Sequence, residues 1–159
     1  MGVSGSGKTT VGAMLAGQLG WRYAEADAFH PAANIEKMAA GHPLTDEDRG
    51  PWLAAIAQWI DIELAAGRPA VVTCSALKRA YREQLRGGRP QVQIVYLQGS
   101  RELIATRLQA RHGHFFTAAM LDSQFADLEE PTPDEGALIV SIVGAPKEIV
   151  DDILAALGR

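Results

Sequence analysis

The chain has 159 residues, of which 47% are apolar and 21% charged, the usage of an ordinary globular domain with one core. Its net charge of −4 disfavours broad binding to nucleic acid or to an anionic membrane, so any polyanion that it binds should be small. The single cysteine, Cys74, excludes an internal disulfide and a cysteine-rich zinc site. No apolar run has the length of a membrane span or the flanks of a signal peptide. We therefore expect a cytoplasmic enzyme with one domain at residues 1–159.

The chain opens on the pattern Gly-x-x-x-x-Gly-Lys-Thr, from Gly2 to Thr9, which is a Walker A phosphate loop. Glycines let the backbone turn its N–H groups into one concavity, and the helix that follows adds the positive end of its dipole. We expect Lys8 at the outer phosphates of ATP and the Thr9 hydroxyl on a Mg2+ ion. A glycine-rich turn that matches by chance is the alternative, and the amphipathic pattern after the loop argues against it. The residues predicted to bind the nucleotide here are Gly2, Ser4, Gly5, Ser6, Gly7, Lys8, Thr9 and Thr10.

A phosphate loop normally follows a buried strand of about five residues. Only Met1 precedes Gly2 in this sequence. In most doubly wound folds that strand lies inside the sheet, so its loss would leave its neighbours unpaired. We therefore expect a truncated or wrongly started chain that lacks its first strand, with Met1 an internal methionine taken as the start.

Helical and strand patterns alternate along the rest of the chain. A first helix should end near Gly20, and the patterns at 31–40 and 117–128 are also helical. Another helix begins at Thr45, with Asp48 as its capping partner, or afresh at Pro51. Three further helices are expected. One passes through Tyr81 and Leu85, one runs from a cap at Ser100 to Gly113, and one begins at Pro146. The strands are expected at residues 21–24, 70–74, 92–97 and 138–142. This alternation predicts an α/β fold, with a doubly wound parallel sheet flanked by helices and a site at the carboxyl ends of the strands.

Candidate side chains for chemistry follow the predicted strands. Asp27 comes just after the 21–24 strand, where a carboxylate can position an acceptor hydroxyl and take its proton, although it could also be a cap or a loop carboxylate. His30 could contact the substrate or cap the next helix. Arg107 and Arg111 are four residues apart, so on a helix two guanidinium groups would share one face and converge on a phosphate chain. Together with Lys78, these groups are what transfer of a phosphoryl group from ATP to a hydroxyl requires.

Five further blocks accompany the phosphate loop. They are His30-Pro31-x-x-Asn34-Ile35-x-Lys37-Met38, Pro43-Leu44-Thr45-Asp46-Glu47-Asp48-Arg49-x-Pro51-Trp52-Leu53, Cys74-Ser75-Ala76-Leu77-Lys78-x-x-Tyr81-Arg82, Arg111-x-Gly113-His114-Phe115 and Leu121-x-x-Gln124-Phe125-x-x-Leu128-Glu129-x-Pro131. With them, nearly the whole chain resembles the small P-loop gluconokinases. The loop alone indicates only a nucleotide, whereas the blocks at 30–53 and 74–78 are specific to this family.

The resemblance implies a nucleoside-monophosphate-kinase-like fold, similar to shikimate and adenylate kinases, with a lid at about residues 111–120. It also implies ATP- and Mg2+-dependent phosphorylation of D-gluconate at its 6-hydroxyl, a step in gluconate use, by a homodimer. The catalytic residues would be Lys8, Asp27 and Arg111, with Arg107 and Arg111 also on the nucleotide. Gluconate would be bound by Asp27, His30, Arg49, Lys78, His114 and Gln124, although a solvated surface charge is the ordinary role of an arginine or lysine.

Two departures from the family pattern affect these assignments. The family usually has Asp-Gly-Asp where this chain has Glu25-Ala26-Asp27, which keeps the presumed base and loses a glycine. His112 stands where the family often has lysine, so one phosphate contact is expected to be weaker. A kinase for shikimate or another sugar acid remains an alternative, as does a nucleotide-binding module without turnover if the first strand is truly absent. A GTPase-like switch is disfavoured because there is no Asn-Lys-x-Asp signature.

Overall fold

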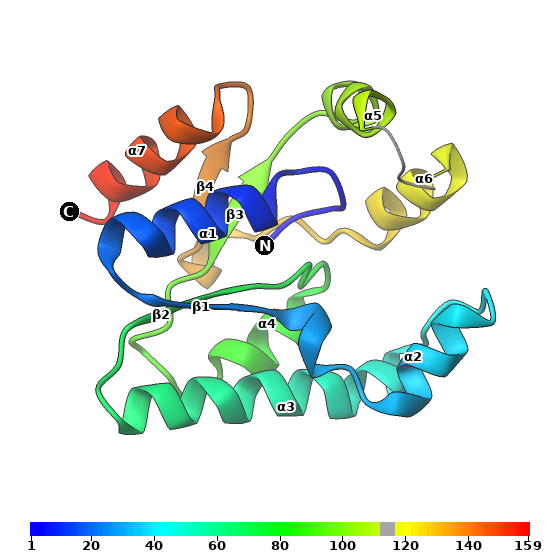
Figure 1. Ribbon diagram of the computed structural model, residues 1–159, viewed down its shortest axis with the longest axis horizontal. Coiled ribbons are helices and arrows are strands. Elements are labelled where there is room, and N and C mark those ends of the chain that lie inside the picture. Colours follow the sequence, from blue (N-terminus) through cyan, green and yellow to red (C-terminus); the bar gives the residue numbers. More distant parts are fainter. Residues whose placement is uncertain (112–116) are drawn as a thin grey trace.

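The computed structural model describes residues 1–111 and 117–159, in which short strands alternate with helices (Figure 1). The elements are α1 (Lys8–Leu19), β1 (Arg22–Glu25), η1 (Ala26–Phe29), α2 (Ala32–Ala39), α3 (Asp46–Ala65), β2 (Ala70–Thr73), α4 (Arg79–Arg86), β3 (Val95–Gln98), α5 (Arg101–Ala110), α6 (Ala118–Asp127), η2 (Pro133–Glu135), β4 (Leu138–Ser141) and α7 (Pro146–Ala156). None of the described helices is long and apolar enough to cross a membrane.

The ends of the helices follow local signals in the sequence. Thr45 and Asp48 form the predicted capping box, with Asp48 N donating to Thr45 Oγ1 at 3.2 Å and Thr45 N donating to Asp48 Oδ2 at 2.8 Å. The helix then continues through Pro51 as one element, so the predicted alternative of a fresh start there is wrong. Because Pro51 has no backbone N–H, the helix continues there without the hydrogen bond to the Glu47 carbonyl. Gly20 ends α1 with φ 66°, in the left-handed region that glycine adopts readily.

The strands form two separate parallel pairs, so the doubly wound parallel sheet that the sequence predicted is divided in two where the neighbours of the missing first strand were expected to be unpaired. β1 pairs with β2 from Arg22↔Ala70 to Glu25↔Thr73, and β3 pairs with β4 from Val95↔Leu138 to Gln98↔Ser141. Met1 lies between the pairs: its N donates to Val95 O at 2.5 Å, and its carbonyl accepts from Leu97 N at 2.9 Å. One residue cannot pair along the length of both neighbouring strands, so no continuous ladder joins β2 to β3.

A cavity of about 650 Å³ lies between the two strand pairs. Its walls are mostly apolar and include Val71 and Val72 of β2, Val95 and Leu97 of β3, and Ile153 of α7. The inner edges of β2 and β3 therefore face a space that the described residues do not fill.

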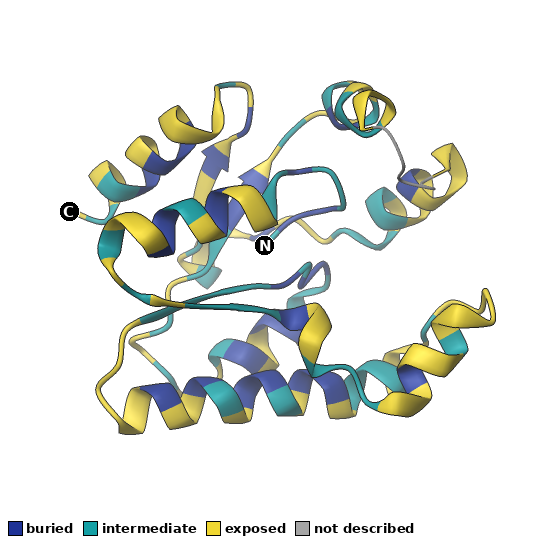
Figure 2. Cartoon of the chain, viewed as in Figure 1, coloured by how far each residue is buried: buried dark blue, intermediate teal, exposed yellow. Residues whose placement is uncertain are grey.

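Helices cover the two strand pairs from opposite sides (Figure 1). α1 and α7 pack on one side, and their buried residues Leu15, Val150 and Ile153 join a core with β3 and β4. α3 and α4 pack on the other side, where α3 turns its buried face toward the strands and its exposed face outward (Figure 2). α2 and α6 project from the same end of the molecule as the phosphate loop and are largely exposed (Figures 1 and 2).

Candidate active site

The phosphate loop requires glycine at specific points. Gly5 and Gly7 have φ 84° and 93°, in the left-handed region. A Cβ on Gly5 would lie 2.8 Å from Leu108 Cγ, so this turn also needs a residue without a side chain. Gly7 is the N-cap of α1, so the free N–H groups of the first helical turn face the concavity of the loop. The loop has the backbone shape that binds a polyphosphate, as the sequence predicted.

A small polar pocket of about 160 Å³ opens at this loop. It brings together several of the predicted residues with side chains from the ends of β1 and β2. Its lining consists of Ser4, Lys8, Thr9, Glu25, Ala26, Asp27, Thr73, Cys74, Ser75 and Gln124. Of the other predicted loop residues, Ser6 is fully buried beneath the loop and Thr10 is exposed on α1.

Lys8 is the charged group at the centre of this pocket. Its Nζ donates to the Val3 carbonyl at 3.0 Å. Burial lowers the pKa of Lys8, the charge of Arg111 lowers it further, and the carboxylates of Asp27 and Glu25 oppose the shift. A half-buried ammonium with no carboxylate within ion-pair distance among the described residues favours an anionic ligand, which suits the predicted contact with phosphates.

Asp27 lies in η1, directly after β1. Its side chain is exposed, and no hydrogen bond or ion pair within the described ranges engages its carboxylate. Glu25 differs, because its carboxylate accepts from the Tyr23 hydroxyl at 2.9 Å. The N-cap of η1 is Glu25, so the alternative in which Asp27 serves as a helix cap is wrong. Trp52 Nε1 donates to the Ala26 carbonyl at 2.7 Å and so fixes η1 against α3.

His30 lies near both Asp27 and Arg49, whose charges act on its ring. Its ring stacks on Trp52 with centroids 4.4 Å apart and planes 10° apart, and Asn34 Nδ2 lies 3.3 Å from its Nδ1. The N-cap of α2 is Pro31, so the predicted alternative of His30 as a cap is wrong. Burial lowers the pKa of His30, with Asp27 opposing the shift and Arg49 adding to it. The sequence did not predict this stacking, because Trp52 lies 22 positions from His30.

This lowered pKa gives the protein a pH dependence. Because the folded-state pKa of His30 lies below its ordinary value of 6.5, the unfolded chain binds this proton more readily. The free energy of unfolding should therefore fall as pH falls below about 6.5, and this component should be absent in His30→Gln. Thermal denaturation of both proteins between pH 5 and pH 8 measures it. Parallel Tm curves for the two would contradict this account.

Arg49 and Lys78 meet at a third group that sequence reasoning did not identify. Lys78 Nζ donates to the two Asp46 carboxylate oxygens at 3.0 and 3.1 Å, and Arg49 Nη1 lies 3.9 Å from Asp46 Oδ1. The Tyr81 hydroxyl donates to Asp46 and accepts from Arg49 Nη1 at 3.2 Å. We call these four residues the Asp46 cluster. The only sequence signal for Asp46 and Tyr81 was their presence in the blocks that also contain Arg49 and Lys78.

The Asp46 cluster joins two cations and a tyrosine hydroxyl to one carboxylate. Hydrogen bonds from Tyr81 and Lys78 lower the pKa of Asp46, and the bond to Asp46 raises the pKa of Lys78. The two cations are therefore already arranged around one carboxylate.

Removal of one cation from this cluster should weaken binding of an acidic substrate. A charge-assisted hydrogen bond contributes about 1.5–3 kcal/mol, so Lys78→Met should raise the KM for a sugar acid roughly 10- to 100-fold. The KM for ATP should stay the same. Lys147→Met is the matched control, because Lys147 lies on α7 and pairs with Asp151 at 2.6 Å. Equal KM values for the wild type and Lys78→Met would contradict the assignment.

The remaining predicted residues have different outcomes. Gln124 bonds to the phosphate loop, because its Oε1 accepts from Ser4 N at 2.6 Å and its Nε2 donates to Ser4 Oγ at 3.0 Å. Arg107 donates to the carbonyls of Ile142 and Gly144, and so points toward the loop before α7. Arg111 follows the last residue of α5 with extended backbone, so the prediction that it shares a helical face with Arg107 is wrong.

Three predictions fall partly or wholly on residues 112–116, outside the described ranges. They concern His112, His114 and half of the predicted lid at 111–120. Thr117 already caps α6, with its hydroxyl accepting from Met120 N at 3.2 Å, so the last residues of the predicted lid belong to that helix. Sequence reasoning also missed Thr73 and Ser75 as pocket residues, although their position at the end of a buried strand was a usable signal.

A phosphate loop with a half-buried lysine, and a carboxylate in the same pocket that no described residue engages, define a P-loop kinase. Comparison with known proteins agrees with this class. A family model described as an AAA domain matches residues 1–131. The APS kinase of Mycobacterium tuberculosis shares the fold at 14% identity, with a TM-score of 0.71 over 100% of this chain and 95% of that one.

Two gluconokinases are much more similar. The chain is 51% identical to that of Gluconobacter oxydans over 154 residues, 97% of this chain and 86% of the relative. It is 46% identical to a solved gluconokinase from Sinorhizobium meliloti, with a TM-score of 0.88 over 100% of this chain and 89% of that one. The chain therefore belongs to the gluconokinase family, as its motifs predicted.

Proposed function

We propose that the chain transfers the terminal phosphoryl group of ATP to the 6-hydroxyl of D-gluconate, with 6-phosphogluconate and ADP as products. One observation carries this proposal: the phosphate loop and the unengaged carboxylate of Asp27 line the same pocket. The Asp46 cluster next to it supplies donors for a substrate carboxylate. Family membership adds the name of the sugar acid, because the relatives are named as gluconokinases.

We assign each residue of the pocket a separate role in the reaction. The backbone N–H groups of the loop and the dipole of α1 hold the polyphosphate, and Lys8 offsets the charge of the transferred group. Asp27 orients the acceptor hydroxyl and takes its proton while the bond from that oxygen to phosphorus forms. The bond from phosphorus to the leaving oxygen of ADP breaks in the same displacement. Arg111, whose charge already influences Lys8, is proposed to stabilise the group in transit.

The pocket also suits Mg2+ bound with ATP. Magnesium prefers oxygen ligands and is held in such sites by one or two protein groups with phosphates and water. The Thr9 hydroxyl would hold it, and the carboxylates of Glu25 and Asp27 line the same pocket. No group of three His, Cys, Asp or Glu side chains in the described residues forms a separate metal site. When bound, the ion neutralises part of the phosphate charge.

Arg49 and Lys78 are proposed to bind the gluconate carboxylate, with His30 between them and the reacting end. Gln124 is proposed to act on the sugar side of the pocket while it holds Ser4. His114 and the lid remain predictions, as does the homodimer, which light scattering coupled to gel filtration would test.

A coupled assay that follows ADP tests the proposed function. The panel contains gluconate, shikimate and two other sugar acids, each with ATP and Mg2+. Turnover with gluconate well above the rest supports the proposal, and turnover only with another acid identifies a related kinase. Thermal denaturation with ATP, gluconate and both together separates an enzyme from a nucleotide-binding module, because a two-substrate site should be stabilised further by the second ligand. Stabilisation by ATP alone, without turnover, would contradict the proposal.

A further inference from the structure

The segment that joins the phosphate pocket to the Asp46 cluster contains a strained turn. Ala76 has φ 44°, the only positive φ at a residue other than glycine in the described ranges, and its side chain is 2% exposed. Ser75, on one side, lines the phosphate pocket, and Lys78, on the other, bonds to Asp46. The backbone at Ala76 therefore sets how the two halves of the site are oriented. An alanine stays in this conformation only when its surroundings hold it there.

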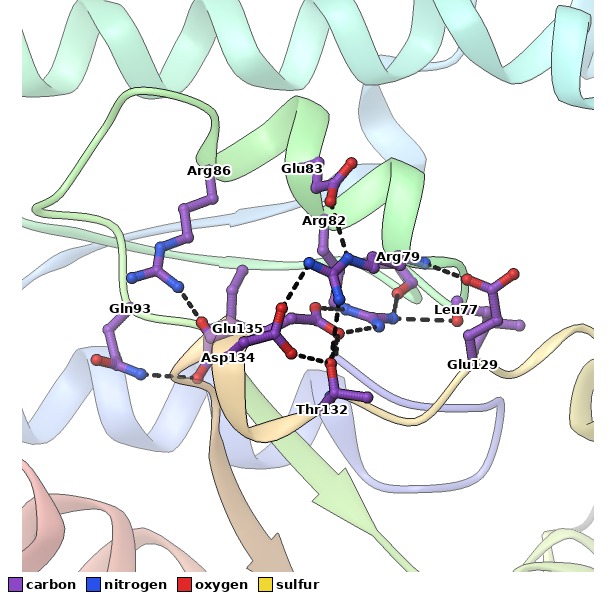
Figure 3. A network of polar contacts seen from close by, with 12 residues as sticks. Leu77, Arg79, Arg82, Glu83, Arg86, Gln93, Glu129, Thr132, Asp134 and Glu135 are labelled. Atoms are coloured by element: carbon purple, nitrogen blue, oxygen red, sulfur yellow. Dashed lines mark hydrogen bonds and ion pairs between the residues drawn. The ribbon is translucent and has the colours of Figure 1, made fainter.

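Arg82 bonds to this turn, and Figure 3 shows its contacts with Leu77 and Glu135. It lies on α4, and its side chain is 2% exposed. Its Nη1 donates to the carbonyls of Ala76 and Leu77, each at 3.1 Å. Its Nε and Nη2 donate to the two carboxylate oxygens of Glu135, at 2.6 and 2.9 Å. The Glu135 carboxylate holds the Nε and Nη2 edge of the planar guanidinium. Because the group is rigid, Nη1 is then directed at the two backbone carbonyls.

Glu135 is itself held by its neighbours (Figure 3). Its Oε1 accepts from Thr132 N at 3.1 Å, and its carbonyl accepts from Arg86. The segment 129–135 that contains it also bonds to the turn directly, because Glu129 N donates to Leu77 O at 2.8 Å.

This segment follows α6, the helix that carries Gln124. Because Gln124 bonds to Ser4, the same stretch of chain contacts both the phosphate loop and the turn at Ala76. The buried pair of Arg82 and Glu135 therefore joins the turn at Ala76 to the stretch of chain that also contacts the phosphate loop.

We propose that Arg82 and Glu135 are positioning residues that hold the turn at Ala76, and so aim Ser75 and Lys78 into the site. This inference rests on the proposed function for its kinetic consequences. Replacing a buried ion pair by apolar residues often leaves stability unchanged, so stability alone does not explain a pair with this geometry. The bonds of Arg82 to two carbonyls of one strained turn explain why the pair has this geometry.

The kinetic test uses Arg82→Lys and Glu135→Gln. Lysine keeps the charge but cannot bond both carbonyls and the carboxylate as a planar fork, and glutamine keeps the shape of the acid. Because small misplacements at a reacting centre cost up to about 100-fold, each variant should raise the KM for gluconate or lower its kcat about tenfold. The KM for ATP should change less than these values, because the left-handed glycines and the bonds of Gln124 to Ser4 also hold the phosphate loop. Adding Ala76→Gly to Arg82→Lys should restore much of the loss, because glycine adopts this φ without support.

Arg89→Lys is the matched control, because Arg89 makes a similar two-pronged pair with Asp61, at 2.6 and 2.7 Å, away from the turn. It should leave both KM values unchanged. A fall in Tm for Arg82→Lys with unchanged KM and kcat for gluconate, per folded molecule, would show a merely structural role and overturn the proposal.

Hydrogen exchange gives a readout that does not need turnover. The amides of residues 75–79 should exchange faster in Arg82→Lys and Glu135→Gln than in the wild type, while those of α1 stay protected. If the wild type does not phosphorylate gluconate, the proposed function fails, and this measurement still decides whether the pair holds the turn. Unchanged exchange at 75–79 in both variants would overturn the positioning role.

Discussion

Asp27→Asn should lower kcat for gluconate roughly 10²- to 10⁴-fold, which is the usual contribution of a general base. The amide keeps the size and part of the hydrogen bonding of the acid, but it cannot accept the proton of the acceptor hydroxyl. The Asp27 side chain is exposed in η1 and makes no described contact that its loss would break, so Tm should change little. Initial rates with ATP and gluconate, together with thermal denaturation, measure both effects.

Glu25→Gln is the matched control for this experiment. Glu25 lines the same pocket, but its carboxylate already accepts from the Tyr23 hydroxyl at 2.9 Å. It should retain most of the activity and lose mainly the contact with Tyr23. ATP binding, measured without acceptor, should be similar in both variants because Lys8 and the loop backbone hold the phosphates. If Glu25→Gln is the inactive variant and Asp27→Asn is not, the two carboxylates have been assigned the wrong way round.

The parts of the fold that sequence patterns predicted well depend on local interactions. The capping box of Thr45 with Asp48 and the Ser100 cap of α5 each involve residues three apart, so the amino acids themselves specify them. The phosphate loop is similar, because glycines and a following helix are enough to shape its backbone. Local chemistry of this kind also carried the family resemblance, which the comparisons confirmed.

The parts that could not be predicted depend on contacts between distant residues. Arg82 and Glu135 are 53 positions apart, and nothing near Arg82 indicates a buried partner for it. Asp46 was part of a recognised block, but its bonds to Lys78 and Tyr81 arise only when α3 packs beside α4. Arg111 was misplaced for a different reason: its spacing from Arg107 suits a helix, whereas the helix ends at Ala110. Hydrophobic periodicity therefore predicted the helices and strands, whereas the ion pairs depend on how those helices and strands pack together.

Filling the cavity between β2 and β3 should stabilise the protein more than any other single change. The inner edges of both strands carry backbone groups without ladder partners, because β2 pairs outward with β1 and β3 pairs outward with β4. The bonds of Met1 to Val95 and Leu97 follow the pattern of a parallel ladder, and Gly2 N donates to Ser75 O at 3.2 Å on the β2 side. A segment that continues back from Met1 would therefore lie between the two strands and parallel to β3.

We expect a fusion of about five β-branched apolar residues before Met1 to raise Tm on the order of 10 °C. Each buried valine or isoleucine stabilises by about 1.5–3 kcal/mol, and the new ladder would satisfy the inner edges of both neighbours. Activity should rise with Tm, because Val3 and the loop would then follow a fixed strand. Differential scanning calorimetry and the coupled assay measure the two effects.

The size of this gain should also depend on pH, because any fusion converts the buried Met1 amine into an amide that does not titrate. Burial lowers the pKa of the Met1 α-amino group to about 5 from 8.0. Between these values the unfolded chain binds more protons, so the stability of the chain that begins at Met1 rises as pH rises from 5 to 8. The fusion replaces that amine by an amide, so its advantage should be larger at pH 5 than at pH 8. A Gly-Ser fusion of equal length also removes the amine but cannot fill the apolar cavity. If the two fusions give the same Tm at pH 8, the cavity is not a strand site.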